Sequence, residues 1–238
     1  MKYKTMSASD APLRPLRSFE LESPRWWRKS GLPLIGIFVV IALLFGLNPP
    51  YPRHRKKVEQ TEAVSNARQI GLALHEFAQE FGRFPDETTV EHVRSQYPTD
   101  MKLGIESSNA MFRQLLATGI ARGEQMFYAK IAGSEVPDGD FKGGKALEKG
   151  ECGFSYFSGL KLEGDPSRPV AVTPLIPGTD RFDYNRFDGK AIILRMDNSV
   201  SSLNIVKSTG RVKINGMNIL DPAHPMWAGE KWKLVRQE

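Results

Sequence analysis

The strongest hydrophobic pattern is an apolar run in which twelve of the sixteen residues from Leu32 to Leu47 are Leu, Ile, Phe or Val. At about −0.3 to −0.6 kcal/mol for each such side chain, the run favours insertion into a bilayer by roughly 5 kcal/mol. A helix of this length measures about 25 Å, slightly less than a hydrocarbon core of about 30 Å, and Trp26 and Trp27 can lie at the interface. The pattern predicts a transmembrane helix over residues 30–48.

The segments on both sides of this run are polar and rich in cations. Cations at both ends argue against a buried core helix, and residues 48–52 lack the small-x-small pattern of a signal peptide cleaved behind its apolar run. We expect residues 1–29 to form a disordered basic leader. Residues 49–57 begin with three prolines in four positions and continue with four cations, which predicts a stiff linker. The cations are nearly balanced, so charge does not decide the orientation.

A second pattern follows in which apolar residues recur every three or four positions, as on one face of a helix. Gly82 and Pro85 are expected to end this helix. We expect the apolar stripe to pack on a sheet of the same domain; a coiled-coil partner is the alternative, although the run is shorter than three heptads. The stripe consists of Ala63, Ala67, Ile70, Leu74, Phe77 and Phe81.

The remaining chain is expected to contain short helices and then strands. Acidic and hydroxyl caps predict helices over residues 86–97 and 107–121, and the Gly-rich, charged residues 133–150 predict a loop. The predicted fold class is α+β: a transmembrane helix, then an amphipathic helix packed on a C-terminal antiparallel sheet in one domain of residues 58–238. The expected strands lie at 154–160, 169–176, 190–196, 200–206 and 211–216, the third and fourth joined by a turn at 197–199.

The net charge of +6 belongs to the flanks of the apolar run. Residues 1–57 contain eleven Lys and Arg and three Asp and Glu, which leaves 22 cations and 24 anions from Val58 onward. The globular part is therefore not basic, and no nucleic-acid-binding motif is present. We expect no nucleic-acid partner.

The candidate chemistry is sparse. The four histidines have no HExxH spacing, and the sequence has neither a G-x-S-x-G elbow nor a phosphate-binding loop. Cys152 is the only cysteine, so no internal disulfide can form, and we expect it to be a small buried residue. We therefore expect no catalytic site and no cofactor.

Calcium is the one ion for which the sequence offers candidate ligands. The loop that opens at Asp138 has lysines at its fifth and twelfth positions, where an EF-hand needs oxygen ligands. Asp180, Asp183 and Asp188 can converge on a cation, or they can be solvated carboxylates of a polar turn.

The residues from Gly31 to Ala42 resemble the signal of type IV prepilins and type II secretion pseudopilins, which is close to G-F-T-L-I-E-L-L-V-V-I-A. Arg28 and Lys29 match the basic leader, and residues 67–77 with 82–85 are similar to the lower helix of major pseudopilins. Residues 195–200 resemble a late turn of pilin-like proteins. The positions that match in the signal are Leu34, Ile35, Val39, Val40, Ile41 and Ala42.

The resemblance implies cleavage between Gly31 and Leu32 and a pilin-like fold in the inner membrane, with the N-terminus cytoplasmic and the domain extracytoplasmic. It also implies pilin-like subunits or a secretion machine as partners, besides membrane lipid. The family's glutamate, five residues after the cleaved glycine, is Gly36 here. That loss suggests a capping or accessory role, or no filament. The residues expected to pack in the membrane are Leu34, Ile35, Gly36, Val39, Val40 and Leu43.

Two functions remain open from the sequence. The first is a pilin-like structural subunit. The second is an uncleaved, membrane-tethered extracytoplasmic binding module, in which aromatic loops form the contact surface unless they serve local packing. The candidate contact residues are Phe182, Tyr184, Phe187 and Trp227.

Overall fold

The structure is a computed structural model that describes residues 52–238. The expected leader, the transmembrane helix over residues 30–48, the candidate cleavage site at Gly31 and Leu32, and the membrane-packing residues lie outside this range. Within it, no helix has both the length and the apolar composition that a membrane crossing requires.

The longest element is helix α2 (Pro52–Phe81), which begins earlier than the sequence predicts. The expected linker of residues 49–57 is therefore wrong from Pro52 onward. The physical reason is that proline is tolerated in the first turn of a helix, where its missing N–H would be unpaired anyway. Arg55 and Glu59 form an i, i+4 ion pair of 3.5 Å in this early part. The end follows the prediction: Gly82 has a φ of 72°, and its N–H donates to the carbonyl of Ala78 over 2.9 Å.

Helices α3 (Glu87–Gln96) and α4 (Ser108–Ala117) confirm the two predicted short helices. The Asp86 side chain caps α3 by accepting from the N–H groups of Thr88 and Thr89. In return, the Thr89 hydroxyl oxygen accepts from the N–H of Asp86. The Ser107 hydroxyl accepts from the N–H of Ala110 and so caps α4. These local bonds explain why the sequence alone located both helices.

An antiparallel sheet of seven strands forms the second layer, in the order β6-β5-β4-β3-β2-β1-β7. This confirms the α+β class with an antiparallel sheet. The β3–β4 hairpin has the predicted turn: Leu194 pairs with Val200, and the Arg195 N–H donates to the Ser199 carbonyl. The strands are β1 (Ser155–Ser158), β2 (Pro169–Thr173), β3 (Lys190–Arg195), β4 (Val200–Val206), β5 (Arg211–Ile214), β6 (Met217–Asn218) and β7 (Lys233–Val235).

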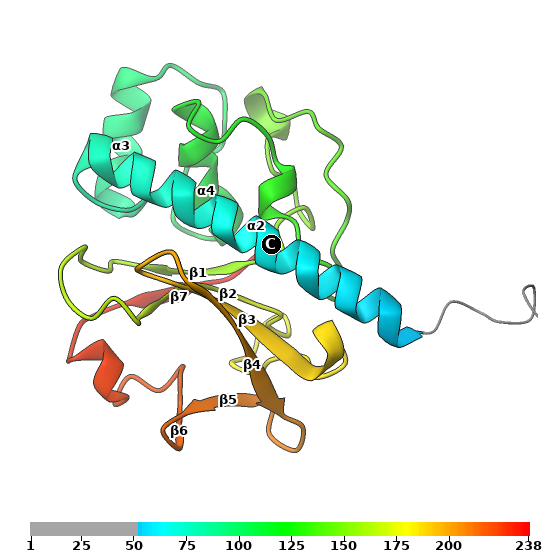
Figure 1. The fold of residues 1–238 in the computed structure, drawn as a ribbon. Helices are drawn as coiled ribbons and strands as arrows, with labels where there is room; N and C mark the ends of the chain where they lie inside the picture. Colours follow the sequence, from blue (N-terminus) through cyan, green and yellow to red (C-terminus); the bar gives the residue numbers. More distant parts are fainter. Residues whose placement is uncertain (1–51) are drawn as a thin grey trace, which may run out of the picture. The chain divides into compact units, whose positions relative to one another are not determined.

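Both faces of the inner strands are covered, since β1 and β2 are buried at every position. Helix α2 crosses one face, with α3 and α4 on the same side (Figure 1). Neighbouring residues of β1 show the two layers: Tyr156 lies against Phe112 of α4, while Phe157 lies against Trp227 and Trp232. Short 3-10 helices complete the fold: η1 (Gln125–Phe127), η2 (Gly143–Lys145), η3 (Phe187–Gly189) and η4 (Pro225–Trp227).

Candidate functional site

The two faces of α2 differ in burial along almost its whole length. Five of the six residues in the apolar stripe are at most 1% exposed, and Phe81 is half-buried and stacked on Phe77 with ring centroids 4.3 Å apart. The opposite face is exposed and includes two large apolar side chains, Val58 at 67% and Leu72 at 62%. The exposed stripe repeats every three or four residues and consists of Val58, Thr61, Ser65, Arg68, Leu72, Glu76 and Gln79.

The exposed α2 stripe consists mostly of short or flexible side chains and has two apolar positions. Arg68 and Glu76 are the charged residues within it, and neither forms an ion pair within 4 Å among the residues that the structure describes. Each therefore remains available to a charge on another chain. A surface of this kind suits the side-by-side packing of helices.

The predicted aromatic contact surface is wrong for three of its four residues. Phe182, Phe187 and Trp227 are at most 1% exposed, whereas Tyr184 is 39% exposed. Phe182 forms an isolated bridge with Leu175, which folds this loop back against the sheet, and η3 begins at Phe187. Trp227 is buried in the aromatic layer and its indole N–H donates to the Ile219 carbonyl over 3.1 Å.

The aspartates considered for calcium do not come together. Asp180 pairs with Arg236, and Asp183 pairs with Arg186 at 3.7 Å while accepting from the N–H of Asn185. Among residues 52–238 these carboxylates form no group whose oxygens lie within 4.8 Å of one another. These three aspartates are therefore better described by the alternative interpretation, as carboxylates of a polar turn.

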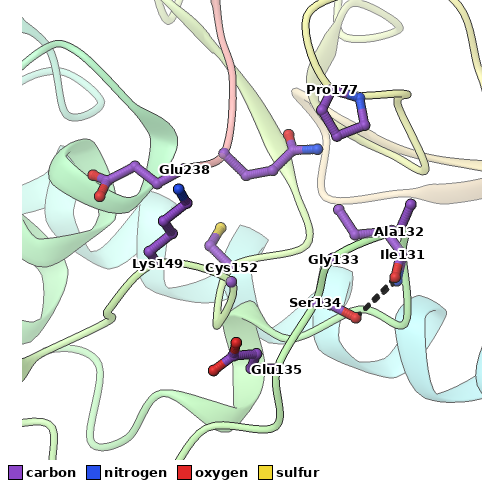
Figure 2. A pocket seen from close by; sticks show the side chains of 11 residues that line it. Ile131, Ala132, Gly133, Ser134, Glu135, Lys149, Cys152, Pro177 and Glu238 are labelled. Carbon is purple, nitrogen blue, oxygen red and sulfur yellow. Dashed lines mark hydrogen bonds between the residues drawn. The ribbon is translucent and has the colours of Figure 1, made fainter.

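A hollow of about 350 Å³ lies beside Cys152, between residues 131–135, residues 149–152 and the last two residues of the chain (Figure 2). Cys152 is 1% exposed, and burial raises the pKa of its thiol to about 11, so it stays protonated at neutral pH. No histidine lines the hollow. The acidic and basic side chains that do line it, those of Glu135, Glu238 and Lys149, form no hydrogen bond with the Cys152 sulfur, whose partners are the Ser108 hydroxyl and the Phe154 carbonyl.

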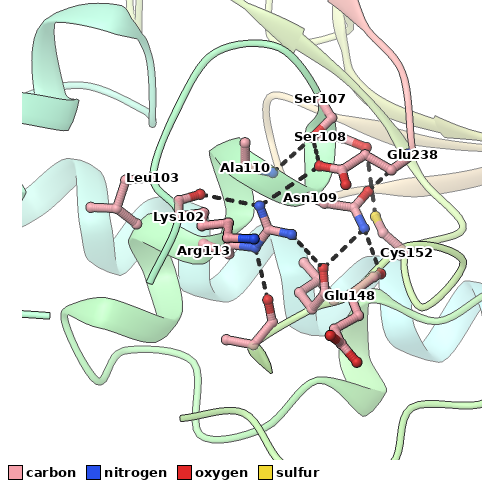
Figure 3. Close-up of polar contacts among 12 residues, drawn as sticks. Lys102, Leu103, Ser107, Ser108, Asn109, Ala110, Arg113, Glu148, Cys152 and Glu238 are labelled. Carbon is pink, nitrogen blue, oxygen red and sulfur yellow. Dashed lines mark hydrogen bonds and ion pairs between the residues drawn. The ribbon is translucent and has the colours of Figure 1, made fainter. Parts of the chain in front are cut away.

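The most extensive polar network belongs to α4 and has a structural use (Figure 3). Arg113 donates to the carbonyls of Ala146 (2.7 Å), Leu147 (2.9 Å) and Lys102 (3.1 Å) and lies 3.7 Å from the Glu238 carboxylate. The buried Asn109 amide donates to the Leu147 and Glu148 carbonyls, and its oxygen accepts from the N–H of Glu238. These side chains fasten residues 146–148 and 236–238 to α4.

Three of the four histidines among the described residues have separate environments, and the fourth, His54, is exposed near the start of α2. His75 lies edge-on to the Phe84 ring at 5.4 Å, and His92 lies edge-on to the Phe81 ring at 5.5 Å. His224 caps η4 by accepting from the N–H of Met226 and forms a second hydrogen bond, with the Ile214 carbonyl. Each of these three side chains takes part in local packing or capping.

The exposed α2 stripe is thus a continuous helix face that no described residue of the domain covers. Sequence reasoning identified the buried face of the helix and did not examine the opposite one, although the same periodicity defines both. Comparison of the chain with protein-family models, with curated proteins and with solved structures gave no match in any of the three.

Proposed function

We propose that the chain is a pilin-like or pseudopilin-like membrane-anchored structural subunit, an accessory component of a type II secretion or type IV pilus-like system. The observation that carries the proposal is the two-faced helix α2. One face is buried against the domain's own sheet, and the other is exposed among the residues that the structure describes. In chain order this helix follows the apolar run and its prepilin-like residues.

The proposed arrangement assigns a task to each part. The apolar run anchors the chain in the inner membrane with its N-terminus in the cytoplasm. The sheet holds α2 rigidly, and the exposed α2 stripe packs against related pilin-like subunits outside the cytoplasm. Because Gly36 stands where the family has a glutamate, we assign the subunit a capping or accessory position rather than the filament body.

Cysteine cross-linking in the native membrane tests this packing. Leu72→Cys puts a thiol in the middle of the exposed stripe, while Val206→Cys, on a residue of β4 that is 37% exposed, is the matched control. The native Cys152 is buried and should not contribute. We expect oxidation to join Leu72→Cys to a cysteine-bearing pilin-like chain, and the control to remain monomeric. Monomer alone for both variants, while the sister subunits carry cysteines on their equivalent helices, would contradict the proposal.

A second function is favoured by one specific observation, the glycine at position 36. Without the carboxylate that pairs with a neighbouring subunit, the chain can remain an uncleaved anchor that tethers a binding module outside the cytoplasm. Of the aromatic residues first considered for its contact surface, Tyr184 is the one that is exposed, and the Lys207 ammonium lies 5.6 Å from its ring centroid. An intact leader on the mature protein would favour this alternative.

A further inference from the structure

Three carboxylates meet in the long segment that connects α4 to β1, away from the exposed α2 stripe. Glu124 precedes η1, Asp138 lies in the loop that follows, and Glu151 comes just before Cys152. One oxygen from each carboxylate lies within 4.8 Å of the others. Sequence reasoning did not identify this group, because its members are far apart in the chain.

Glu124 is the residue that makes the group unusual. Its side chain is buried, with the residue 1% exposed. Oε1 accepts a hydrogen bond from the N–H of Leu147, whereas Oε2 is buried and has no hydrogen-bond partner among the described residues. Leaving a buried carboxylate oxygen without a partner destabilises the folded protein. A bound cation would satisfy this oxygen.

The negative charge of the group is also uncompensated within the described part of the chain. None of its ion pairs includes Glu124, Asp138 or Glu151. The cations nearest to the group in sequence, Arg122, Lys142 and Lys149, form no ion pair with it among the described residues. The pKa of Glu124 is raised, first by burial and then by the negative charges of Glu151 and Asp138.

Backbone N–H groups hold the carboxylates in place. Glu151 accepts from the N–H groups of Glu148 (2.5 Å) and Asp138 (3.2 Å), and Asp138 accepts from the N–H of Asp140 (2.7 Å). These bonds fix the orientation of the acidic side chains, and each carboxylate retains further lone pairs. The group is therefore preorganised rather than a chance meeting of mobile surface acids.

We propose that Glu124, Asp138 and Glu151 bind one Ca²⁺ ion. Calcium prefers hard oxygen ligands at about 2.3–2.6 Å, so two ligands on opposite sides of the ion are about 4.6–5.2 Å apart, which agrees with the spacing of the group. The carboxylates can supply several oxygens, one of them the unpartnered Oε2 of Glu124. Because Asp138 is exposed, the ion can enter from solvent and water can complete its coordination.

The ion would stabilise a segment that has little other regular structure. Between the end of α4 and the start of β1 the chain forms two 3-10 helices and no strand. A cation held by residues 124, 138 and 151 would tie three points of this segment together, next to the place where α4 fastens residues 146–148. This role does not depend on the proposed function, so either inference can fail alone.

A calcium titration of the full-length protein in mild detergent tests the site. After treatment with a chelator and dialysis, thermal unfolding and calorimetric binding are measured with Ca²⁺, with Mg²⁺ and with no divalent ion, up to about 10 mM, above the weakest usual range of about 10⁻³ M. We expect Ca²⁺ to bind and to raise the unfolding temperature by several degrees. Magnesium, which demands a tighter octahedral shell, should do so at least tenfold more weakly.

Variants distinguish the site from a general effect of calcium. Asp138→Asn changes an exposed residue and should leave the domain folded while weakening calcium affinity at least tenfold; Glu124→Gln should do the same or abolish binding. Glu135→Gln, an exposed acid of the same loop outside the group, is the matched control and should bind like the parent. The proposal is overturned if the parent shows neither binding heat nor a thermal shift, as expected if Glu124 is simply protonated. It is also overturned if Asp138→Asn binds as tightly as Glu135→Gln.

Discussion

The orientation of α2 on the sheet leads to a sharp comparison between Ile70→Ala and Leu72→Ala. The two residues are separated by one position on the same helix, and both are aliphatic. Ile70 is fully buried in the core, whereas Leu72 is 62% exposed. Any effect on helix propensity is similar for both, because alanine is the better helix former in each case. The difference between the variants therefore measures burial.

The expected magnitudes follow from the buried side chains. At about 0.8 kcal/mol per buried carbon, removing everything beyond Cβ of Ile70 costs about 2.4 kcal/mol. The cavity left in the core adds to this, and the gain in helix propensity subtracts a few tenths, so about 3 kcal/mol of unfolding free energy should be lost. Leu72 has little more than a third of its surface to lose, so its replacement should cost less than about 1 kcal/mol.

Urea unfolding of the full-length protein in mild detergent provides the measurement. It is followed by far-UV circular dichroism and by tryptophan fluorescence, to which the buried Trp227 contributes. The midpoint should fall strongly for Ile70→Ala and hardly for Leu72→Ala, with unchanged m values. Equal losses for the two variants, or a larger loss for Leu72→Ala, would refute the assignment of the buried and exposed faces on which the proposed packing surface depends.

Four further predictions concern buried groups. Gly153→Ala should cost about 3 kcal/mol by urea unfolding, because its Cβ would lie 2.5 Å from the backbone oxygen of Ala129; a cost below about 0.5 kcal/mol would show that this backbone can move aside. Glu230→Gln should cost about 3 kcal/mol by the same assay, since it leaves the buried guanidinium of Arg168 without its anionic partner; no change would mean that its carbonyl partners suffice. Cys152 should not react with Ellman's reagent at pH 8 until the protein unfolds, and rapid labelling of the native protein would contradict its burial. Because the folded thiol has a pKa of about 11, above the ordinary value of about 8.5, stability should also fall as the pH rises between these values.

The parts of the fold that the sequence predicted are those fixed by local chemistry. The Asp86 and Ser107 caps act on N–H groups two or three residues away, and the stripe of α2 repeats at helical spacing. The β3–β4 hairpin depends on a short turn between two apolar runs. In each case the decisive interaction lies within a few residues, so the pattern is readable without the tertiary structure.

Most of the missed features depend on partners distant in sequence. Strand β7 is short and exists because it pairs with β1. Strand β6 is a local exception: it pairs with β5 across a turn at Asn215 and Gly216, which the predicted strand over 211–216 had included. The loop aromatics Phe182 and Phe187 are buried because the loop folds back on the domain, a contact that hydrophobicity alone does not distinguish from an exposed patch.

The candidate sites also divide into one that local sequence indicates and one that depends on residues distant in sequence. The carboxylates of Glu124, Asp138 and Glu151 come together through the path of an irregular loop, so no spacing rule could have found them. The exposed α2 stripe, by contrast, was implicit in the periodicity that predicted the buried face. Its importance became apparent once the buried face was placed on the sheet.

The most direct test of the central claim is the N-terminal sequence of the protein recovered from its native membrane. If the chain is a pilin-like subunit, a prepilin peptidase removes the leader and the mature protein begins at Leu32. A mature protein that begins at Met1 would contradict the claim, and the chain would then be a tethered extracytoplasmic domain without filament assembly.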